Sequence, residues 1–484
     1  YVKSLMPDTE MGIISIPADY GLPLTRNGRE KIHDRFLQEL RRLKPKGVGI
    51  SCTAISQAEE TIHLCEEIKA HDPHIQTFVG GYFPTVYYED IFERTSAVDW
   101  IVIGEGEVPA HRIISCMEQG KDPREADIPN LAWKEDGRVH MTRCGERFDL
   151  RKKALINLDL LKHPGGYDIL PYAFSRGCPY NCHCCMEEFI RPVRKAVPRE
   201  IILQDLTHLA RETRSRSLLV SDTLFKSYDV FPFLRSLDMK VHFETRCDIL
   251  DPKRISAFAD VCGMLILGFE SASFDTLRRM NKVRDRDHYN RYLSNTMEIF
   301  RQCITHEVPL MIFMIAGYPG DTEDDLKASL AFAKKLSRLK GPGGHVFKIG
   351  ECHVYPKTKI HELALSLPDV IFDDDGVFGQ NIVRQASGHL PFDTILKYTK
   401  EIFNLSNPTE KLQWTMLHMM PFFRLPVEAL RDDMVPDDCF HDENREIFNP
   451  HGQSIATFKG LVPALTHKYR ESMSDQRSKR LLPF

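Results

Sequence analysis

The sequence has no long apolar run and no strong imbalance of charge. No stretch of about 18 apolar residues occurs, so we expect no membrane-spanning helix and no membrane partner. Its 64 basic and 68 acidic residues give a net charge of −4, which disfavours a nucleic-acid-coating protein. Repeats, low-complexity tracts and charge blocks are also missing. What remains is a globular composition, 42% apolar and 27% charged over 484 residues, which predicts two or three domains.

Signs of secretion are missing too. The first ten residues, YVKSLMPDTE, contain neither the basic nor the apolar segment of a signal peptide, and residue 1 is not Met, so we expect an earlier native start. Most of the thirteen cysteines are scattered singly. Scattered thiols are typical of reduced proteins, where they serve as small buried apolar groups. We therefore expect a cytoplasmic protein.

Four cysteines, by contrast, gather in one short segment, SRGCPYNCHCC, from Ser175 to Cys185. Cys178, Cys182 and Cys185 have the spacing C-x3-C-x2-C. A structural zinc site usually takes two separated pairs of ligands, and no second pair follows at zinc-finger distance. Three close thiolates instead fit three corners of a 4Fe–4S cluster, whose fourth iron is left for a ligand from outside the protein. The alternatives are a zinc knuckle or a chance cluster, and Cys184 is expected to be a bystander thiol.

Strand-like and helix-like segments alternate from about Met11 to Gly120. We predict strands at 11–16, 47–53, 75–81 and 98–107, and helices at 29–43, 58–72 and 108–120. This α/β pattern is typical of a doubly wound, flavodoxin-like domain, here residues 1–125. Such a domain usually opens with one more strand and helix, so we expect ~30 further native residues in front. In the predicted linker, residues 126–169, a turn at Asp136-Gly137 joins two short strands.

A second alternating series begins near Leu170. Its six predicted strands lie at 170–177, 217–223, 241–247, 263–271, 310–322 and 345–356. Six strand–helix units over residues 170–368 predict a partial (β/α)6 barrel, with the cysteine segment after its first strand, at the catalytic mouth. For residues 369–484 we expect a mainly helical domain that covers the substrate site. Its Met- and Phe-rich stretch, 413–423, is typical of a core.

The second series resembles the radical S-adenosylmethionine (radical SAM) superfamily over about residues 170–356. The cysteine motif follows the first strand, and FETRCDIL, LGFESAS, MIAGYPGDT and VYPKT follow in the family's order. The resemblance implies that the three cysteines hold the cluster and that Arg246 holds the SAM carboxylate. It further implies that an external donor such as flavodoxin or ferredoxin supplies electrons. The SAM-binding residues that it implies are Ser221, Arg246, Glu270, Ser271 and Gly317.

Three Gly-rich loops follow predicted strands of the front domain: GISCTA (49–54), VGGYFPT (79–85) and IGEGEVP (103–109). Ligands of open α/β sheets bind just outside such strand ends, and small residues let a large flat ligand approach the backbone. The alternative is that these glycines only shape turns. The order of the two domains resembles cobalamin-dependent radical SAM enzymes. The candidate cobalamin contacts are Ser51, Thr53, Gly80, Gly81, Phe83, Thr85, Gly104, Glu105 and Gly106, with Phe83 in place of the family's usual His.

The lower face of cobalt is expected to lack a protein histidine. The D-x-H-x-x-G signature of His-ligating proteins is absent, since DPHIQT (72–77) ends in Thr and precedes a strand. Methylthiotransferases are a rival family, because they carry a second cluster on a similar front domain. Cys52 could be one such ligand, but Gly80-Gly81 stands where a Gly-Cys pair is expected, and their C-terminal RNA-binding barrel is not evident.

The resemblance implies a methyltransferase acting on a carbon of a small metabolite. Methylcobalamin would carry the methyl group, and SAM would be both methyl donor and radical source. One alternative is a cobalamin-dependent cyclase or rearrangement enzyme. A second is a non-catalytic cobalamin or Fe–S sensor, against which Arg246 and Glu270 argue, because a sensor has no need to chelate SAM.

Overall fold

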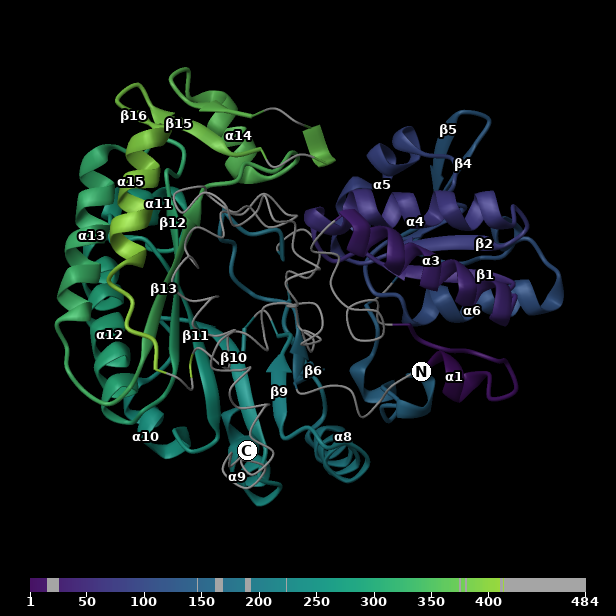
Figure 1. The fold of residues 1–484 in the computed structure, drawn as a ribbon, viewed down its shortest axis with the longest axis horizontal. Coiled ribbons are helices and arrows are strands. Elements are labelled where there is room, and N and C mark those ends of the chain that lie inside the picture. Colours follow the sequence, from purple (N-terminus) through teal and green to yellow (C-terminus); the bar gives the residue numbers. More distant parts are fainter. Residues whose placement is uncertain are drawn as a thin grey trace. The chain divides into compact units, whose positions relative to one another are not determined.

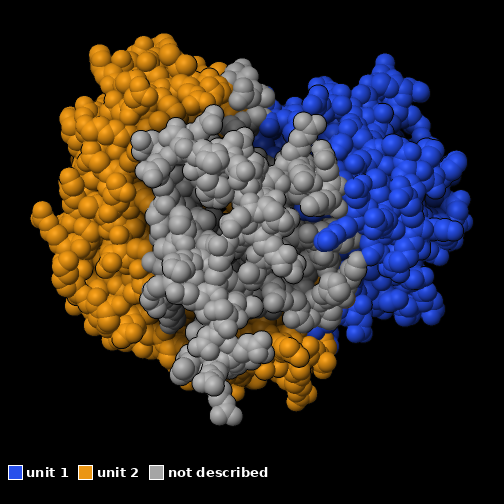
Figure 2. Space-filling model, viewed as in Figure 1, with its two compact units in different colours: residues 1–14, 26–160, 375–379 blue, residues 15–25, 161–374, 380–484 orange. Residues whose placement is uncertain are grey.

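The fold is taken from a computed structural model of the chain. It describes residues 1–14, 26–145, 147–161, 169–187, 193–222, 224–373, 376–378, 381–409 and 412. The chain divides into two compact units: unit 1 comprises residues 1–14, 26–160 and 375–379, and unit 2 comprises 15–25, 161–374 and 380–484 (Figure 2). Within the described ranges, no helix is both long enough and apolar enough to cross a bilayer.

Unit 1 contains a five-stranded mixed sheet in the order β1-β2-β3-β4-β5 (Figure 1). The first three strands are parallel, and the last two are antiparallel to their neighbours. The strands are β1 (Gly47–Ser51), β2 (Gln76–Gly80), β3 (Trp100–Val102), β4 (Leu131–Glu135) and β5 (Arg138–Met141). The helices are α1 (Val2–Leu5), α3 (Arg26–Leu43), α4 (Ala58–His71), α5 (Tyr82–Arg94) and α6 (Glu107–Gln119).

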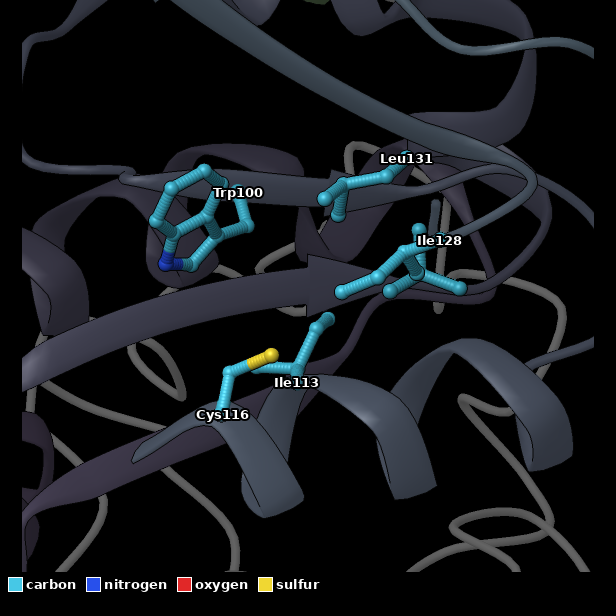
Figure 3. Close-up of a cluster of buried hydrophobic side chains, with 6 residues drawn as sticks. Trp100, Ile113, Cys116, Ile128 and Leu131 are labelled. Atoms are coloured by element: carbon cyan, nitrogen blue, oxygen red, sulfur yellow. The ribbon is translucent and has the colours of Figure 1, made fainter. Parts of the chain in front are cut away.

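An apolar cluster between α6 and the sheet shows why these elements form. Ile113 and Cys116 lie three residues apart on α6, so both point to the same side of the helix. They meet Trp100 of β3, Leu131 of β4 and Ile128, all buried (Figure 3). Gly120 ends α6 in the left-handed region, at φ 63°. The helix predicted at 108–120 is therefore confirmed, as are those at 29–43 and 58–72.

The hairpin at Asp136-Gly137 is confirmed, and it does more than the sequence predicted. Both turn residues have positive φ, 49° and 76°, as a two-residue hairpin turn of type I′ requires. The two strands that it joins, β4 and β5, extend the sheet of unit 1, because β4 pairs with β3. The sequence also gave no indication of helix α5, which begins directly after the Gly80-Gly81 pair.

The strand predicted at 11–16 is wrong for its described part. Residues 11–14 belong to no strand of the sheet; Ile13 forms an isolated β-bridge and donates its N–H to Leu160 O at 2.6 Å. The apolar run around Ile13 is too short to distinguish a strand from an extended segment. Residues 15 and 16 lie outside the described residues.

Unit 2 contains a six-stranded parallel sheet in the order β13-β12-β11-β10-β9-β6 (Figure 1). The six strands that the sequence predicts are therefore present. They are β6 (Leu170–Tyr172), β9 (Ser217–Val220), β10 (Lys240–Arg246), β11 (Cys262–Glu270), β12 (Leu310–Ala316) and β13 (His345–Glu351). The accompanying helices are α8 (Arg199–Glu212), α9 (Phe231–Ser236), α10 (Ile255–Phe258), α11 (Phe274–Arg279), α12 (Arg286–Thr305), α13 (Glu323–Ser337) and α14 (Lys359–Ser366).

The two faces of this sheet differ in character. On the outer face, Phe243 packs against Phe258 of α10, and Phe347 packs against Phe300 of α12, with ring centroids 5.8 and 6.3 Å apart. Side chains alternate along a strand, so the immediate neighbours of Phe243 on β10 and of Phe347 on β13 point to the opposite face. We call this the inner face. It carries several polar residues above an apolar cluster of Met264, Ile266, Met311, Val346 and Leu412.

Smaller elements complete unit 2. A two-stranded sheet pairs β7 (Ser175–Arg176) with β8 (Lys195–Ala196). A three-stranded antiparallel sheet of β14 (Ile371–Phe372), β15 (Val383–Ser387) and β16 (Leu390–Pro391) is followed by α15 (Phe392–Phe403). The domain expected at 369–484, mainly helical, thus begins with strands. After α15, residues 404–409 and 412 are described, and the stretch 413–423 lies outside the described residues.

Two glycines of unit 1 offer a matched test of backbone strain. Gly81 has φ 114°, and a Cβ there would lie 2.3 Å from Cys52 O. Gly104 also has positive φ, 76°, but nothing lies within 4 Å of its Cβ position. We expect Gly104→Ala to cost ~1 kcal/mol of stability from strain alone, and Gly81→Ala to cost clearly more, because a backbone atom must move. Urea unfolding of the cofactor-free protein measures both. Equal losses would contradict the close approach of β1 and the start of α5.

Candidate functional site

The predicted cobalamin residues of unit 1 lie where its parallel strands end. Three hydrogen bonds tie the Gly-rich loops together there. Cys52 N donates to Gly80 O at 2.8 Å, which links the ends of β1 and β2. The Thr85 hydroxyl donates to Gly81 O at 2.7 Å and accepts from Gly104 N at 2.8 Å, which links the second loop to the third. The structure therefore brings these three loops together at one edge of the sheet.

The side chains at this edge fall into two groups. Phe83 is buried and packs on Tyr87, with ring centroids 4.8 Å apart, and Glu105 accepts from Phe148 N at 2.7 Å, so both serve packing inside unit 1. Ser51 is exposed, and Gly104 has open space over its Cβ position. Thr53 is exposed, but its hydroxyl donates to Gln57 Oε1. Small groups over this edge fit a large flat ligand such as cobalamin. The individual contacts, Gly106 included, stay predictions.

In unit 2, Asp222 anchors the strand that leads into the cysteine segment. Its carboxylate accepts from Phe174 N at 2.7 Å and Ser175 N at 3.0 Å, and it also accepts from the Ser175 hydroxyl. Burial raises the pKa of Asp222 to about 6. Its neighbour Ser221 is exposed and uses its backbone N–H to bond Tyr172 O at 3.0 Å. Asp222 therefore positions the start of the cysteine segment, and the hydroxyl of Ser221 is left at the surface.

The cysteine segment presents its three spaced thiols from one loop. Cys178 is buried, Cys182 is half-buried and Cys185 is exposed, and all three are reduced. Arg246 of β10 donates from Nη1 to Cys182 Sγ at 2.9 Å. Three thiols from one loop beside a fixed cation are a donor set that fits a 4Fe–4S cluster. Cys184 stands between two of these cysteines, and burial followed by the negative charge of Glu270 raises its pKa.

Arg246 occupies the centre of this group of polar residues. Its guanidinium forms two parallel hydrogen bonds with Asp248, of 2.9 and 2.8 Å, and lies 4.2 Å from the centre of the Tyr180 ring. It also donates to Lys282 O at 3.3 Å. Burial opposes ionisation of Asp248, but the hydrogen bonds and charge of Arg246 prevail and lower its pKa. Arg246 therefore holds β10, the cysteine segment and the Lys282 segment together.

A second charged pair stands at the end of β11. Lys282 is buried, and its Nζ donates to Glu270 Oε1 at 2.6 Å and to Gly268 O at 2.9 Å. Glu270 itself has positive φ, 68°, which is uncommon for a residue with a side chain and often marks a functional site. The sequence predicted Glu270 but missed Lys282, since nothing in the stretch RRMNKVRD distinguishes that lysine from a surface one.

Of the other three predicted SAM residues, Ser221 is exposed, and the structure shows Ser271 and Gly317 against other elements. Ser271 is buried, and its hydroxyl lies 3.2 Å from Ser329 Oγ of α13 and accepts from Ser273 N. Gly317 has φ 76°, and a Cβ there would lie 2.5 Å from Ile395 of α15. Packing of α13 and α15 thus accounts for a small residue at each position. Their contacts with SAM stay predictions.

Two further charged residues of the inner face, Glu244 on β10 and Lys348 on β13, were also missed. Each is half-buried. The signal was available in the sequence: both stand at inward positions of strands that are otherwise mainly apolar, VHFETR and HVFKIGE. Burial and then the negative charge of Glu270 raise the pKa of Glu244 to about 7, against the opposing charge of Lys282.

The raised pKa makes Glu244 a testable source of pH dependence. Its contribution to stability is complete below the ordinary value of 4.5 and is lost as the pH rises through about 7. Glu244→Gln removes this loss, so the melting temperature of the variant should gain on that of the cofactor-free wild type between those two pH values. Glu298→Gln is the control. Hydrogen bonds from Arg301 lower the pKa of Glu298, so the difference in melting temperature between this variant and the wild type should change only below about pH 4.5. A constant difference for Glu244→Gln would contradict the burial of this carboxyl.

Comparisons with known proteins agree with the two-unit division. The chain matches the family described as B12 binding domain over residues 19–114, and the Radical SAM superfamily over residues 172–333. It is 30% identical over 118 residues to the anaerobic magnesium-protoporphyrin IX monomethyl ester cyclase of Synechocystis, a match that spans only 23% of each protein. It is 22% identical over 372 residues to an uncharacterized methyltransferase of Pyrococcus horikoshii, spanning 69% of this chain and 77% of that one.

Among solved structures, the chain is similar to TsrM from Kitasatospora setae, a radical S-adenosylmethionine methyltransferase solved with tryptophan substrate and a SAM analogue. The TM-score is 0.59 at 14% identity, over 91% of this chain and 92% of TsrM, which shows a shared fold. Another structure of TsrM holds cobalamin and a [4Fe–4S] cluster. The chain thus combines a B12-binding domain with a radical SAM domain, and these two families imply cobalamin, SAM and a [4Fe–4S] cluster as cofactors.

Proposed function

We propose that this protein transfers a methyl group to a carbon atom of a small molecule. In this proposal methylcobalamin carries the methyl group, and SAM is both methyl donor and radical source. The observation that supports it is that one chain contains both a B12-binding domain and two polar contacts of the predicted SAM residues. These contacts are the one between Arg246 and Cys182 of the cysteine segment and the one between Lys282 and Glu270. The methyltransferases among its relatives agree with it.

The residues of unit 2 would divide the work as follows. Cys178, Cys182 and Cys185 would bind three irons of the cluster, and Arg246 would offer its charge to the SAM carboxylate next to the loop. Lys282 would fix the direction of the Glu270 carboxylate, because its ammonium donates to that oxygen at 2.6 Å. When bound, the cofactors supply a carbon-centred radical and a transferable methyl group. In unit 1, the edge lined by Ser51, Gly80 and Gly104 would receive cobalamin.

A cyclase or rearrangement enzyme is the second candidate. The similarity to the Synechocystis cyclase favours it, although that match spans only 23% of either protein. Both candidates need SAM in the same place, so the contacts of Arg246 and Glu270 do not discriminate between them. A sensor would need neither contact.

Counting products distinguishes these candidates. The reconstituted enzyme is incubated with a reduced electron donor, SAM carrying a deuterated methyl group, and a fractionated small-molecule extract. We expect equal amounts of 5′-deoxyadenosine and S-adenosylhomocysteine, with the label in a small molecule, because one SAM would give the radical and a second the methyl group. 5′-Deoxyadenosine without S-adenosylhomocysteine would favour the cyclase. The absence of both products would overturn the proposal that the protein is an enzyme. Cys178→Ala is the control that should form no 5′-deoxyadenosine.

The cluster ligands can be tested by absorbance alone. Replacing Cys178, Cys182 or Cys185 with Ala should each abolish the brown absorbance of the reconstituted cluster, because each removes one of three iron ligands. Cys184→Ala is a matched control from the same segment and should keep the absorbance, since Cys184 lies outside the C-x3-C-x2-C spacing. Loss of the cluster in Cys184→Ala, with the chain still folded by circular dichroism, would contradict this ligand assignment.

A further inference from the structure

Lys348 extends from the inner face of the six-stranded sheet. Its neighbour Phe347 points to the outer face and packs on Phe300, whereas Val346 belongs to the inner apolar cluster. Lys348 therefore shares the inner face with Val346, two residues away. Its partner on β12 is Phe313, which also packs against that cluster.

Lys348 lies in the same cross-sheet row as Arg246. Paired residues run from Arg246 on β10 through Gly268 on β11 and Phe313 on β12 to Lys348 on β13. Three strand spacings of about 4.8 Å separate the two ends, or ~14 Å along the sheet. The two cations are therefore on one face but cannot hold the same small anion at close range from neighbouring strands.

Two charged pairs near this face are balanced, and Glu244 and Lys348 stand outside them. Asp248 neutralises Arg246, and Lys282 neutralises Glu270, both through direct hydrogen bonds. Among the described residues, none forms a hydrogen bond or an ion pair with the Lys348 ammonium. Burial lowers the pKa of Lys348, and the more distant charge of Glu351 only partly opposes this. A half-buried cation without a partner costs free energy that an apolar residue at this position would avoid.

We propose that Lys348 binds an anionic group of the substrate, a carboxylate or a phosphate. The inference rests on the proposed function in taking this face as the place of the substrate. The carboxylate of SAM is a different anion, because its expected partner is Arg246, at the other end of the row. A compact ammonium on a flexible stem suits a carboxylate or phosphate oxygen, and such a contact would balance the positive charge of Lys348. The structural alternative is that the lysine stem covers Phe313 and its ammonium reaches water.

Isothermal titration calorimetry with two simple anions tests this. Acetate and inorganic phosphate are each titrated into the enzyme loaded with cluster, cobalamin and SAM, with potassium chloride holding the ionic strength constant. We expect the wild type to bind at least one of them, and the stronger of the two identifies the substrate group as carboxylate or phosphate. Lys348→Met should weaken that binding at least ~10-fold, or about 1.4 kcal/mol. Lys348→Arg should retain it, because the positive charge remains.

Lys335→Met, an exposed lysine of α13, is the matched control and should bind like the wild type. If Lys348→Met does not load its cofactors, Lys348→Gln takes its place. Equal binding by wild type and the neutral variant, or no binding of either anion by wild type, would overturn the proposal. Anion binding requires no turnover, so this test can fail while S-adenosylhomocysteine and 5′-deoxyadenosine still form, and it can succeed if they do not.

Discussion

The buried guanidinium of Arg246 is the contact on which the polar half of unit 2 depends. It donates to Asp248, to Cys182 Sγ and to Lys282 O, and it lies over the Tyr180 ring. Those partners come from three separate parts of the chain. A planar group with five donors can satisfy all of them at once, which the single point charge of lysine could not do. The direction of β10 thus fixes where the cysteine segment lies relative to the inner face.

Burial makes the charge pairs of this face interdependent. Glu270 and Lys282 neutralise one another, and the field of Lys282 also opposes the rise in the pKa of Glu244. Removing one member of a buried pair leaves an uncompensated charge, which typically costs about 3–5 kcal/mol. In the proposed function the same pairs would hold a charged cofactor, so the same residues would serve both folding and cofactor binding. Lys348 stands outside this mutual compensation, which is why a ligand is the natural counterpart for its charge.

Much of the fold could be predicted from the sequence, because strong periodicity and short-range signals carry that information. The six parallel strands, the turn at Asp136-Gly137 and the main helices are of this kind. The pairing of β4 with β3 was not, because it is a tertiary choice that no local pattern records. The strand predicted around Ile13 failed for the opposite reason, since a short apolar run forms a strand only where a sheet edge accepts it.

For the candidate site, the sequence could indicate residue types at strand ends but not the contacts that they make. Arg246 and Glu270 were predicted at positions where the structure places buried charge pairs, although their contacts with SAM stay untested. Ser271 shows the limit of such reasoning, because its hydroxyl turns toward Ser329 of α13, a residue 58 positions further along the chain. Lys282 is an example of a contact that the sequence analysis missed. It follows Glu270 by twelve positions, yet only the fold brings its ammonium to that carboxylate. A side chain's partner is decided by which elements pack together, so charged residues at inward strand positions are the sequence signal that deserves most weight.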